Sequence, residues 1–215
     1  MKISSLLWIC LLLCWPLSAS ALNPVATLYL LDKSVTLDRA GKLTDLRQIE
    51  TPLTNGDRIE TGPSGRAKLT FENGDVTFLG PNSQLTVSAE PEGQNWKIEL
   101  NLVGKLRALV NKRQDKNFRV RTVSAVIGVK GTDFVADAPG AETRVATFKG
   151  LVFLRSLKTQ QDIDVPAGKE GAIGPAGEIM PLRDIAGDIL EGVEIAGKQL
   201  STEEAAGSKI GCTNC

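Results

Sequence analysis

The sequence contains no histidine among its 215 residues. This excludes every Ser-His-Asp or Cys-His catalytic arrangement, every imidazole metal site and the side chain that titrates most readily near neutral pH. The formal net charge is zero, because Lys and Arg total 25 and Asp and Glu total 25. An overall electrostatic attraction to nucleic acid is therefore not expected. There is also no phosphate-binding glycine loop and no EF-hand-like calcium loop. We therefore expect no nucleic-acid partner, no cofactor and no metal.

Long apolar runs are confined to the N-terminus. A short basic start precedes an apolar run over Leu6–Leu17, and residues 18–21 form a small-residue cleavage site. The run is shorter than the roughly 20 apolar residues that cross a bilayer, and it contains Pro16. We predict a signal peptide over residues 1–21, with an uncleaved anchor or a lipidated cysteine as the alternatives. No later stretch predicts a transmembrane segment, so we expect a periplasmic or secreted protein after cleavage.

The rest of the chain alternates apolar and polar residues as strands do. The clearest case surrounds Asn73-Gly74, which predicts a hairpin with a two-residue turn. The apolar residues of its two strands would then share one face, in the pairs Phe71 with Val76 and Leu69 with Phe78.

Turn residues follow one another about every 8 to 12 positions, which is typical of a sandwich, a barrel or a short β-solenoid. We predict an all-β domain over residues 22–180, either an antiparallel sandwich or a short solenoid. Residues 181–215 are predicted to form a short C-terminal helix, over Asp184–Leu200, and a tail. The helix is suggested by apolar residues near helical spacing, although three glycines weaken it.

Glycine also lies inside strand-like sequence in the segment Phe118–Ala136, where it marks a bulge or a close backbone approach. This segment, with the Lys149-Gly150 and Ala167-Gly168 turns, resembles the FecR family of envelope proteins. The positions that match the family motif are Val129, Lys130, Gly131, Thr132 and Phe134.

Residues 56–69 also resemble the family's opening strands, so the resemblance covers about residues 25–175. Three positions depart from the family pattern. Lys130 replaces the usual arginine, Val123 replaces a frequent proline, and Lys149 replaces a frequent glutamate. The lysine lacks the planar donor fork of arginine, so a bidentate contact of the arginine kind is not expected at that position.

In the best-known members of the family, this domain is periplasmic and is tethered to a membrane helix and a cytoplasmic anti-sigma segment. The sequence shows neither segment. The resemblance therefore implies an exported, stand-alone FecR-like β domain that binds an envelope protein or serves as a scaffold or signal sensor. It does not imply sigma-factor regulation or iron uptake.

Cys212 and Cys215 end the chain, and we interpret them as a disulfide, either within the chain or between chains. The alternative is a secreted enzyme, with thiol-disulfide exchange at these cysteines. Such thiols normally lie at a helix N-terminus in a βα unit. A second enzymatic alternative is a glycosidase that uses a carboxylate pair. The available pairs are Asp162 with Asp164 and Glu203 with Glu204.

Basic residues are concentrated between positions 105 and 121. On strands, Lys105 and Arg107 would share a face, as would Arg119 and Arg121, with Leu106, Ala108, Phe118 and Val120 turned inward. The four cations predict either a solvated face or a binding face for an acidic protein, an anionic envelope polymer or lipid headgroups. A third possibility is that the acidic segment 155–215 of the same chain covers these basic side chains.

Overall fold

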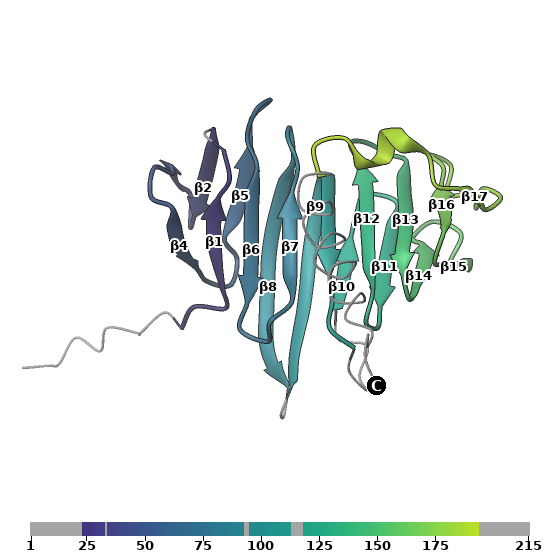
Figure 1. The fold of residues 1–215 in the computed structure, drawn as a ribbon, viewed down its shortest axis with the longest axis horizontal. Coiled ribbons are helices and arrows are strands. Elements are labelled where there is room, and N and C mark those ends of the chain that lie inside the picture. Colours follow the sequence, from purple (N-terminus) through teal and green to yellow (C-terminus); the bar gives the residue numbers. More distant parts are fainter. Residues whose placement is uncertain (1–22, 33, 93–94, 113–117, 194–215) are drawn as a thin grey trace, which may run out of the picture.

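The computed structural model describes residues 23–32, 34–92, 95–112 and 118–193. These residues form 17 strands, which agrees with the predicted all-β class (Figure 1). The strands are β1 (Ala26–Leu30), β2 (Val35–Arg39), β3 (Lys42–Asp45), β4 (Glu50–Leu53), β5 (Arg58–Thr61), β6 (Ala67–Phe71), β7 (Val76–Leu79), β8 (Gln84–Glu92), β9 (Asn95–Leu109), β10 (Phe118–Arg121), β11 (Ala125–Val129), β12 (Asp133–Ala138), β13 (Thr143–Lys149), β14 (Leu151–Ser156), β15 (Asp162–Pro166), β16 (Lys169–Ile173) and β17 (Arg183–Asp184).

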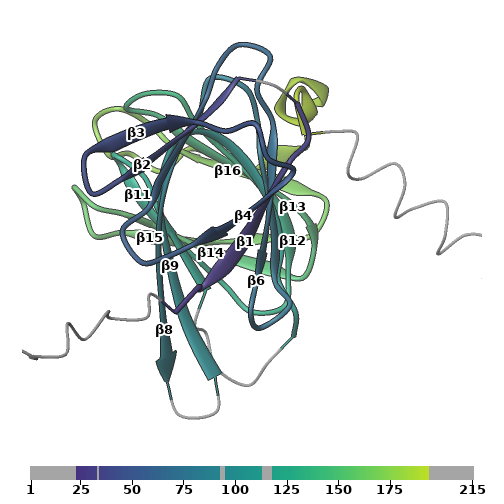
Figure 2. The same cartoon turned by 90° about the vertical axis from the view of Figure 1, so that its left-hand side faces the viewer.

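The strands are arranged as two sheets that face each other across one core (Figure 2). Sheet A has the order β4-β1-β6-β7-β9-β12-β13-β16-β17, and sheet B has the order β3-β2-β5-β8-β9-β10-β11-β14-β15. Neighbouring strands are antiparallel except for the parallel pair β9 and β10. The long strand β9 joins the sheets, because it pairs within sheet B up to Val103 and within sheet A from Gly104.

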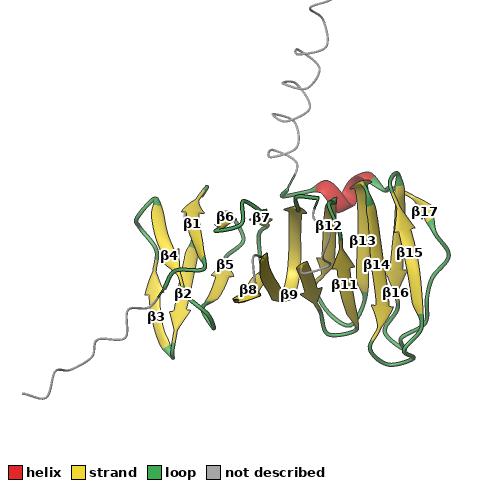
Figure 3. Cartoon of the chain, turned by 90° about the horizontal axis from the view of Figure 1, so that it is seen from below, coloured by secondary structure: helices red, strands yellow, loops and turns green. Residues whose placement is uncertain are grey.

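After β9, consecutive hairpins alternate between the two sheets. The pairs β10–β11 and β14–β15 lie in sheet B, and the pairs β12–β13 and β16–β17 lie in sheet A. Figures 1 and 3 show the strands side by side along the long axis of the molecule. The architecture is thus an elongated antiparallel sandwich, in which each crossing between sheets needs a tight corner.

The core lies between the sheets and consists of the inward-facing residues of alternating strands. The ring of Phe118 packs edge-on against Phe71 at 6.3 Å and against Phe134 at 6.5 Å. Burial of one such ring contributes about 1.5–3 kcal/mol to folding. The residues predicted to turn inward beside the basic positions are all buried, namely Leu106, Ala108, Phe118 and Val120.

The hairpin predicted around Asn73-Gly74 is present, but its predicted register is wrong by one residue. Gly74 N–H donates to Phe71 O at 2.8 Å, and Phe71 N–H donates to Asp75 O at 2.9 Å, so the loop has three residues. Within that loop, Gly74 has the positive φ, at 81°. A two-residue type I′ turn would need a positive φ at two positions.

The longer loop changes which residues of β7 face the core. Leu69 pairs with Thr77, and Thr70 pairs with Val76. Thr77 is therefore buried, and Val76 and Phe78 lie on the outer face of sheet A. Asp75, also turned inward, accepts a hydrogen bond from Asn111 N–H at 2.9 Å. This contact comes from a distant part of the chain, which local pattern does not reveal.

The helix predicted over Asp184–Leu200 is not found among the described residues of that range. Arg183–Asp184 forms the short strand β17, and Gly187–Leu190 forms a single 3-10 turn, η1. Residues 194–215 lie outside the described part. Figure 2 shows η1 on the outer side of sheet A, away from sheet B. No helix among the described residues is long and apolar enough to cross a membrane.

Candidate functional site

The family motif forms the corner at which the chain passes from sheet B to sheet A. Val129 ends β11, and Phe134 lies in β12. Between them, Thr132 N–H donates to Val110 O at 3.0 Å and Thr132 O accepts from Val110 N–H at 2.8 Å, which holds the corner against the end of β9. Gly131 has a φ of 68°, in the left-handed region that favours glycine.

Three side chains of the motif are buried and the lysine is exposed. Val129, Thr132 and Phe134 are at most 2% exposed. Lys130 points to solvent, so the replacement of arginine by lysine falls on a surface position. The motif therefore shapes the backbone and the core at the sheet crossing, and it places no reactive group there.

The predicted basic residues do not form one face. Lys105 and Arg107 lie on the part of β9 that belongs to sheet A. Arg119 and Arg121 lie on β10 beside Glu99 and Asn101, in sheet B. Because the two sheets face each other, the outer sides of these strands point in opposite directions.

The two sheet A cations are paired with acidic residues of β12. Arg107 is only 8% exposed, and its Nε and Nη2 donate to the two carboxylate oxygens of Asp133 at 2.9 and 2.7 Å. Lys105 Nζ lies 3.5 Å from an Asp137 oxygen. In sheet B, Arg121 Nε donates to Glu99 at 3.3 Å, and Arg119 is exposed.

A row of cross-strand neighbours crosses the outer face of sheet A. Register places Arg107, Val135, Ala146, Glu170 and Arg183 beside one another on β9, β12, β13, β16 and β17. Outward positions of a sheet are usually wet, yet Val135, Ala146 and Glu170 are all 0% exposed. Something in the fold must therefore cover this row.

Residues 183–193, which we call the strap, provide the cover. Ile189 and Val193 of the strap form a second apolar cluster with Val135 and Ala146, separate from the main core. Phe148, Ile185 and Leu190 pack around it. Figure 1 shows the strap running across the ends of β12, β13 and β16.

Polar contacts hold the strap at its edges. Arg144 donates to Asp188 of the strap at 2.8 Å and to Glu170 of β16 at 2.8 Å. Lys105 Nζ donates to Asp188 O at 3.1 Å. Lys169 pairs with Asp184 at 2.8 Å. Cations of sheet A thus meet both acidic side chains near the start of the strap.

These contacts shift the pKa values of the groups involved. Hydrogen bonds to Asp188 and Glu170 raise the pKa of Arg144 above its ordinary value. Burial alone would raise the pKa of Glu170, but hydrogen bonds from Arg144, Arg183 and Ala186 N–H bring it below its ordinary value. The hydrogen bond from Arg144 likewise lowers the pKa of Asp188. All three groups are therefore charged at neutral pH.

Sequence reasoning did not single out Val135, Arg144, Ala146 or Glu170. One signal was available, because the strands Asp133–Ala138 and Thr143–Lys149 break the alternation with consecutive apolar residues. Consecutive apolar residues indicate burial on both faces of a sheet. That pattern does not identify the covering segment. Cover by the acidic segment 155–215 was one of the possibilities for the basic strands, and the strap lies within that segment and contacts Lys105 through Asp188 O.

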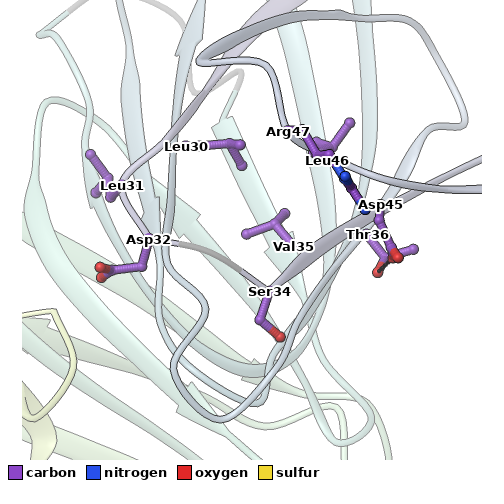
Figure 4. Close-up of a pocket in the computed structure, with 9 residues that line it drawn as sticks. All are labelled: Leu30, Leu31, Asp32, Ser34, Val35, Thr36, Asp45, Leu46 and Arg47. Atoms are coloured by element: carbon purple, nitrogen blue, oxygen red, sulfur yellow. Dashed lines mark hydrogen bonds between the residues drawn. The ribbon is translucent and has the colours of Figure 1, made fainter.

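A second feature lies at the end of the sandwich formed by β1 to β4. A hollow of about 800 Å³ is bordered by the residues in Figure 4, namely Leu30, Leu31, Asp32, Ser34, Val35, Thr36, Asp45, Leu46 and Arg47. A neighbouring hollow of about 530 Å³ lies between β3 and the start of β4. The end also exposes apolar side chains, with Leu31 at 50%, Leu43 at 64% and Ile49 at 74%.

An ion pair with a buried carboxylate lies beneath the hollows. Asp57 is 1% exposed and accepts hydrogen bonds from Arg39 Nε at 2.9 Å, Arg39 Nη2 at 2.6 Å and Thr54 N–H at 2.8 Å. Arg39 also donates to Pro52 O at 2.8 Å. One arginine of β2 therefore connects β4 with the turn that precedes β5.

Comparison with protein families gives a match over residues 57–153 to the family described as FecR protein. Residues 57–153 form a FecR domain. The matched region starts at the buried Asp57, contains the sheet-crossing corner and ends in β14. The strap and strands β1 to β4 lie outside it, although both pack on the FecR domain through Arg39, Arg144 and Lys105.

Two solved structures share the fold. Both are crystal structures of candidate anti-sigma factors from Parabacteroides distasonis, at 1.65 and 2.50 Å resolution. Each has a TM-score of 0.51 and 18% sequence identity, and the similarity covers 59% of this chain and 59% of the other. The likeness therefore concerns the fold, over somewhat more than half of each chain. No curated protein sequence matches the chain.

The remaining predicted residues lie elsewhere. Asp162 and Asp164 are exposed on β15, and Asp162 pairs with Arg155 at 2.6 Å. The signal peptide over 1–21, Cys212, Cys215, Glu203 and Glu204 lie outside the described residues. The disulfide and the cleavage site stay predictions. Among the described residues, no group of three or more His, Cys, Asp or Glu side chains is placed to hold a metal.

Proposed function

We propose that this FecR-domain protein is a non-catalytic binding module of the cell envelope, which senses or transmits a state by holding a segment of protein on the outer face of sheet A. The observation that carries the proposal is the strap. Its apolar residues Ile189 and Val193 pack on Val135 and Ala146, and its Asp188 carboxylate pairs with Arg144. The face is thus built to hold a peptide segment.

The chemistry of the face supports binding over catalysis. Its charged side chains are engaged in ion pairs and hydrogen bonds, as in Arg107 with Asp133 and Arg144 with Glu170. A carboxylate general acid has a raised pKa, whereas the pKa of the buried Glu170 is lowered. The family and the fold shared with candidate anti-sigma factors support a regulatory role for the domain.

Export to the periplasm is a further part of the proposal and rests on residues 1–21. Intact-mass measurement of protein produced with its own N-terminus tests it. We expect a chain that begins at Leu22. A chain that retains Met1, or one that begins at Cys14 with a lipid mass, would contradict export by the predicted cleavage.

Photo-crosslinking in intact cells tests the binding face. A photoreactive residue at Phe78, on the outer face of sheet A beside Arg107, should give an adduct with a protein partner. The same residue at Val126, on the outer face of sheet B, is the control. Arg144→Glu should abolish the adduct and Arg121→Glu should not. An adduct that is equal from both positions, or insensitive to Arg144→Glu, overturns the proposed face.

A further inference from the structure

The strap is an addition to a sandwich that already has a complete core. The main core between the sheets contains none of its residues, and the cluster beneath the strap is separate. The strap contributes no strand beyond the two residues of β17, and its one regular element is the four-residue η1. A segment of this kind can leave the sheet while the two sheets stay packed.

The contacts of the strap are of the type that a competing segment reproduces. Ile189 supplies aliphatic surface over Val135, and the Asp188 carboxylate takes two guanidinium nitrogens of Arg144 at 2.8 and 3.2 Å. Asp188 O accepts from Lys105 Nζ. The strap also brings Arg183, whose Nε and Nη2 donate to the buried Glu170 at 3.1 and 2.5 Å. The requirement is therefore a short run with a carboxylate directly beside an aliphatic residue and a basic residue a few positions before them.

The face beneath the strap carries cations that match the acidic groups of such a run. Without the strap, Lys105, Arg107 and Arg144 lie among three acidic side chains of the same face, those of Asp133, Asp137 and Glu170. The uncovered face is thus balanced in charge around an apolar centre, and Arg144 and Lys105 lose their contacts with Asp188. The strap itself carries three acidic residues and one basic residue.

We propose that the strap is an internal, displaceable ligand, and that it occupies the docking site of an acidic, aliphatic segment of a partner protein. This inference rests on the proposed function and adds the chemistry of the partner and its regulation. Because the strap is tethered next to its site, its effective concentration is on the order of millimolar for a short connection. A partner segment of equal chemistry therefore binds only when the strap is weakened or when further contacts assist it.

The test uses the full chain and a labelled synthetic peptide with the sequence of residues 183–193, followed by fluorescence anisotropy. Two variants weaken the strap by different means. Ile189→Asp removes its apolar anchor, and Asp188→Lys places a cation against Arg144. Glu191→Gln is the matched control, because Glu191 is an exposed strap acid with no ion pair to any described residue.

We expect the two weakened variants to bind the peptide at least tenfold more tightly than the wild type and the Glu191→Gln control. Adding Arg144→Glu to the Ile189→Asp variant should remove the binding. A peptide with asparagine in place of both aspartates should bind at least tenfold more weakly. Thermal melts and near-ultraviolet circular dichroism check that each variant keeps the sandwich.

Folded variants that bind the peptide no better than the wild type overturn the inference. Strap exchange between two copies, seen as a dimer by light scattering of the weakened variants without peptide, also overturns it in favour of self-association. The proposed function fails separately, if the crosslink from position 78 is insensitive to Arg144→Glu. In another outcome, the adduct from position 78 forms as expected while the weakened variants fail to bind the 183–193 peptide. That result would support the face as a binding site and would reject the strap as its regulator.

Discussion

Gly150 lies directly against the carbonyl oxygen of Gly131, where an added Cβ would be 2.6 Å from that oxygen. Both glycines have a positive φ, at 86° and 68°. They belong to successive corners, one between β11 and β12 and the other between β13 and β14. The family motif and the Lys149-Gly150 turn are thus two parts of one contact, which requires glycine at position 150. At Gly131 an added Cβ would instead lie 2.7 Å from Cα and Cβ of Lys112.

The first prediction separates this contact from simple backbone strain. Gly150→Ala should lower the free energy of unfolding by more than Gly168→Ala. Both positions have a similar positive φ, but an added Cβ at Gly168 meets nothing within 4 Å. Strain alone costs about 1–2 kcal/mol, and the clash adds to it at Gly150. Urea unfolding of the two variants measures the difference, and equal losses would contradict the role of the Gly131 contact.

The second prediction concerns Thr132 at the same corner. Its Oγ1 is buried and has no hydrogen-bond partner among the described residues, whereas its Cγ2 packs near Gly150. Burial of an unpaired hydroxyl costs about 1–3 kcal/mol. Thr132→Val should therefore leave the melting temperature unchanged or raise it by a few degrees. Thr132→Ser, which keeps the hydroxyl and loses the methyl, should lower it.

The third prediction is a pH dependence that arises from Glu170. Because its pKa is lowered in the folded state, its contribution to stability is present above its ordinary value of 4.5 and is lost as the pH falls below it. Melting temperatures between pH 7 and pH 3 should fall in this acid range. Glu170→Gln should be less stable at pH 7, by about 2 kcal/mol or more, and its further loss in acid should be smaller than that of the wild type.

The fourth prediction concerns the ion pair beneath the hollows. Asp57→Asn leaves Arg39 with one acceptor oxygen in place of a bidentate carboxylate, and it removes the charge that balances the guanidinium. The Asp57 side chain is 2% exposed and the Arg39 side chain 37%, so water can solvate the guanidinium that remains, and the expected loss is about 1–3 kcal/mol. Asp45→Asn is a suitable control, because Asp45 is exposed and, among the described residues, its side chain bonds the Thr36 hydroxyl alone. Guanidinium unfolding that gives equal losses for the two variants would reject the importance of the pair.

The sequence alone determined the all-β class and the inward faces of several strands. Alternation around Leu106 and Phe118 identified their inward faces correctly, because successive side chains of a strand point to opposite sides. Gly131 was interpreted as a bulge or a close backbone approach, and Lys149-Gly150 as a turn; both glycines have a positive φ, which is a local requirement. These features depend on neighbours in the chain, so a single sequence contains the information.

Only the tertiary structure decided which strands and charges become neighbours. Arg107 pairs with Asp133, which lies 26 residues away in the sequence, and Arg144 pairs with Asp188, which lies 44 residues away. These pairings turned an expected basic face into two separate surfaces, one of which lies beneath the strap. Likewise, the contact of Asp75 with Asn111 accompanies a hairpin register that the Asn73-Gly74 pattern did not predict. The physical reason is that ion pairs and the burial of the outer face of sheet A depend on which distant segments the two sheets bring together. The periodicity of apolar residues does not specify the order of strands in the sheets.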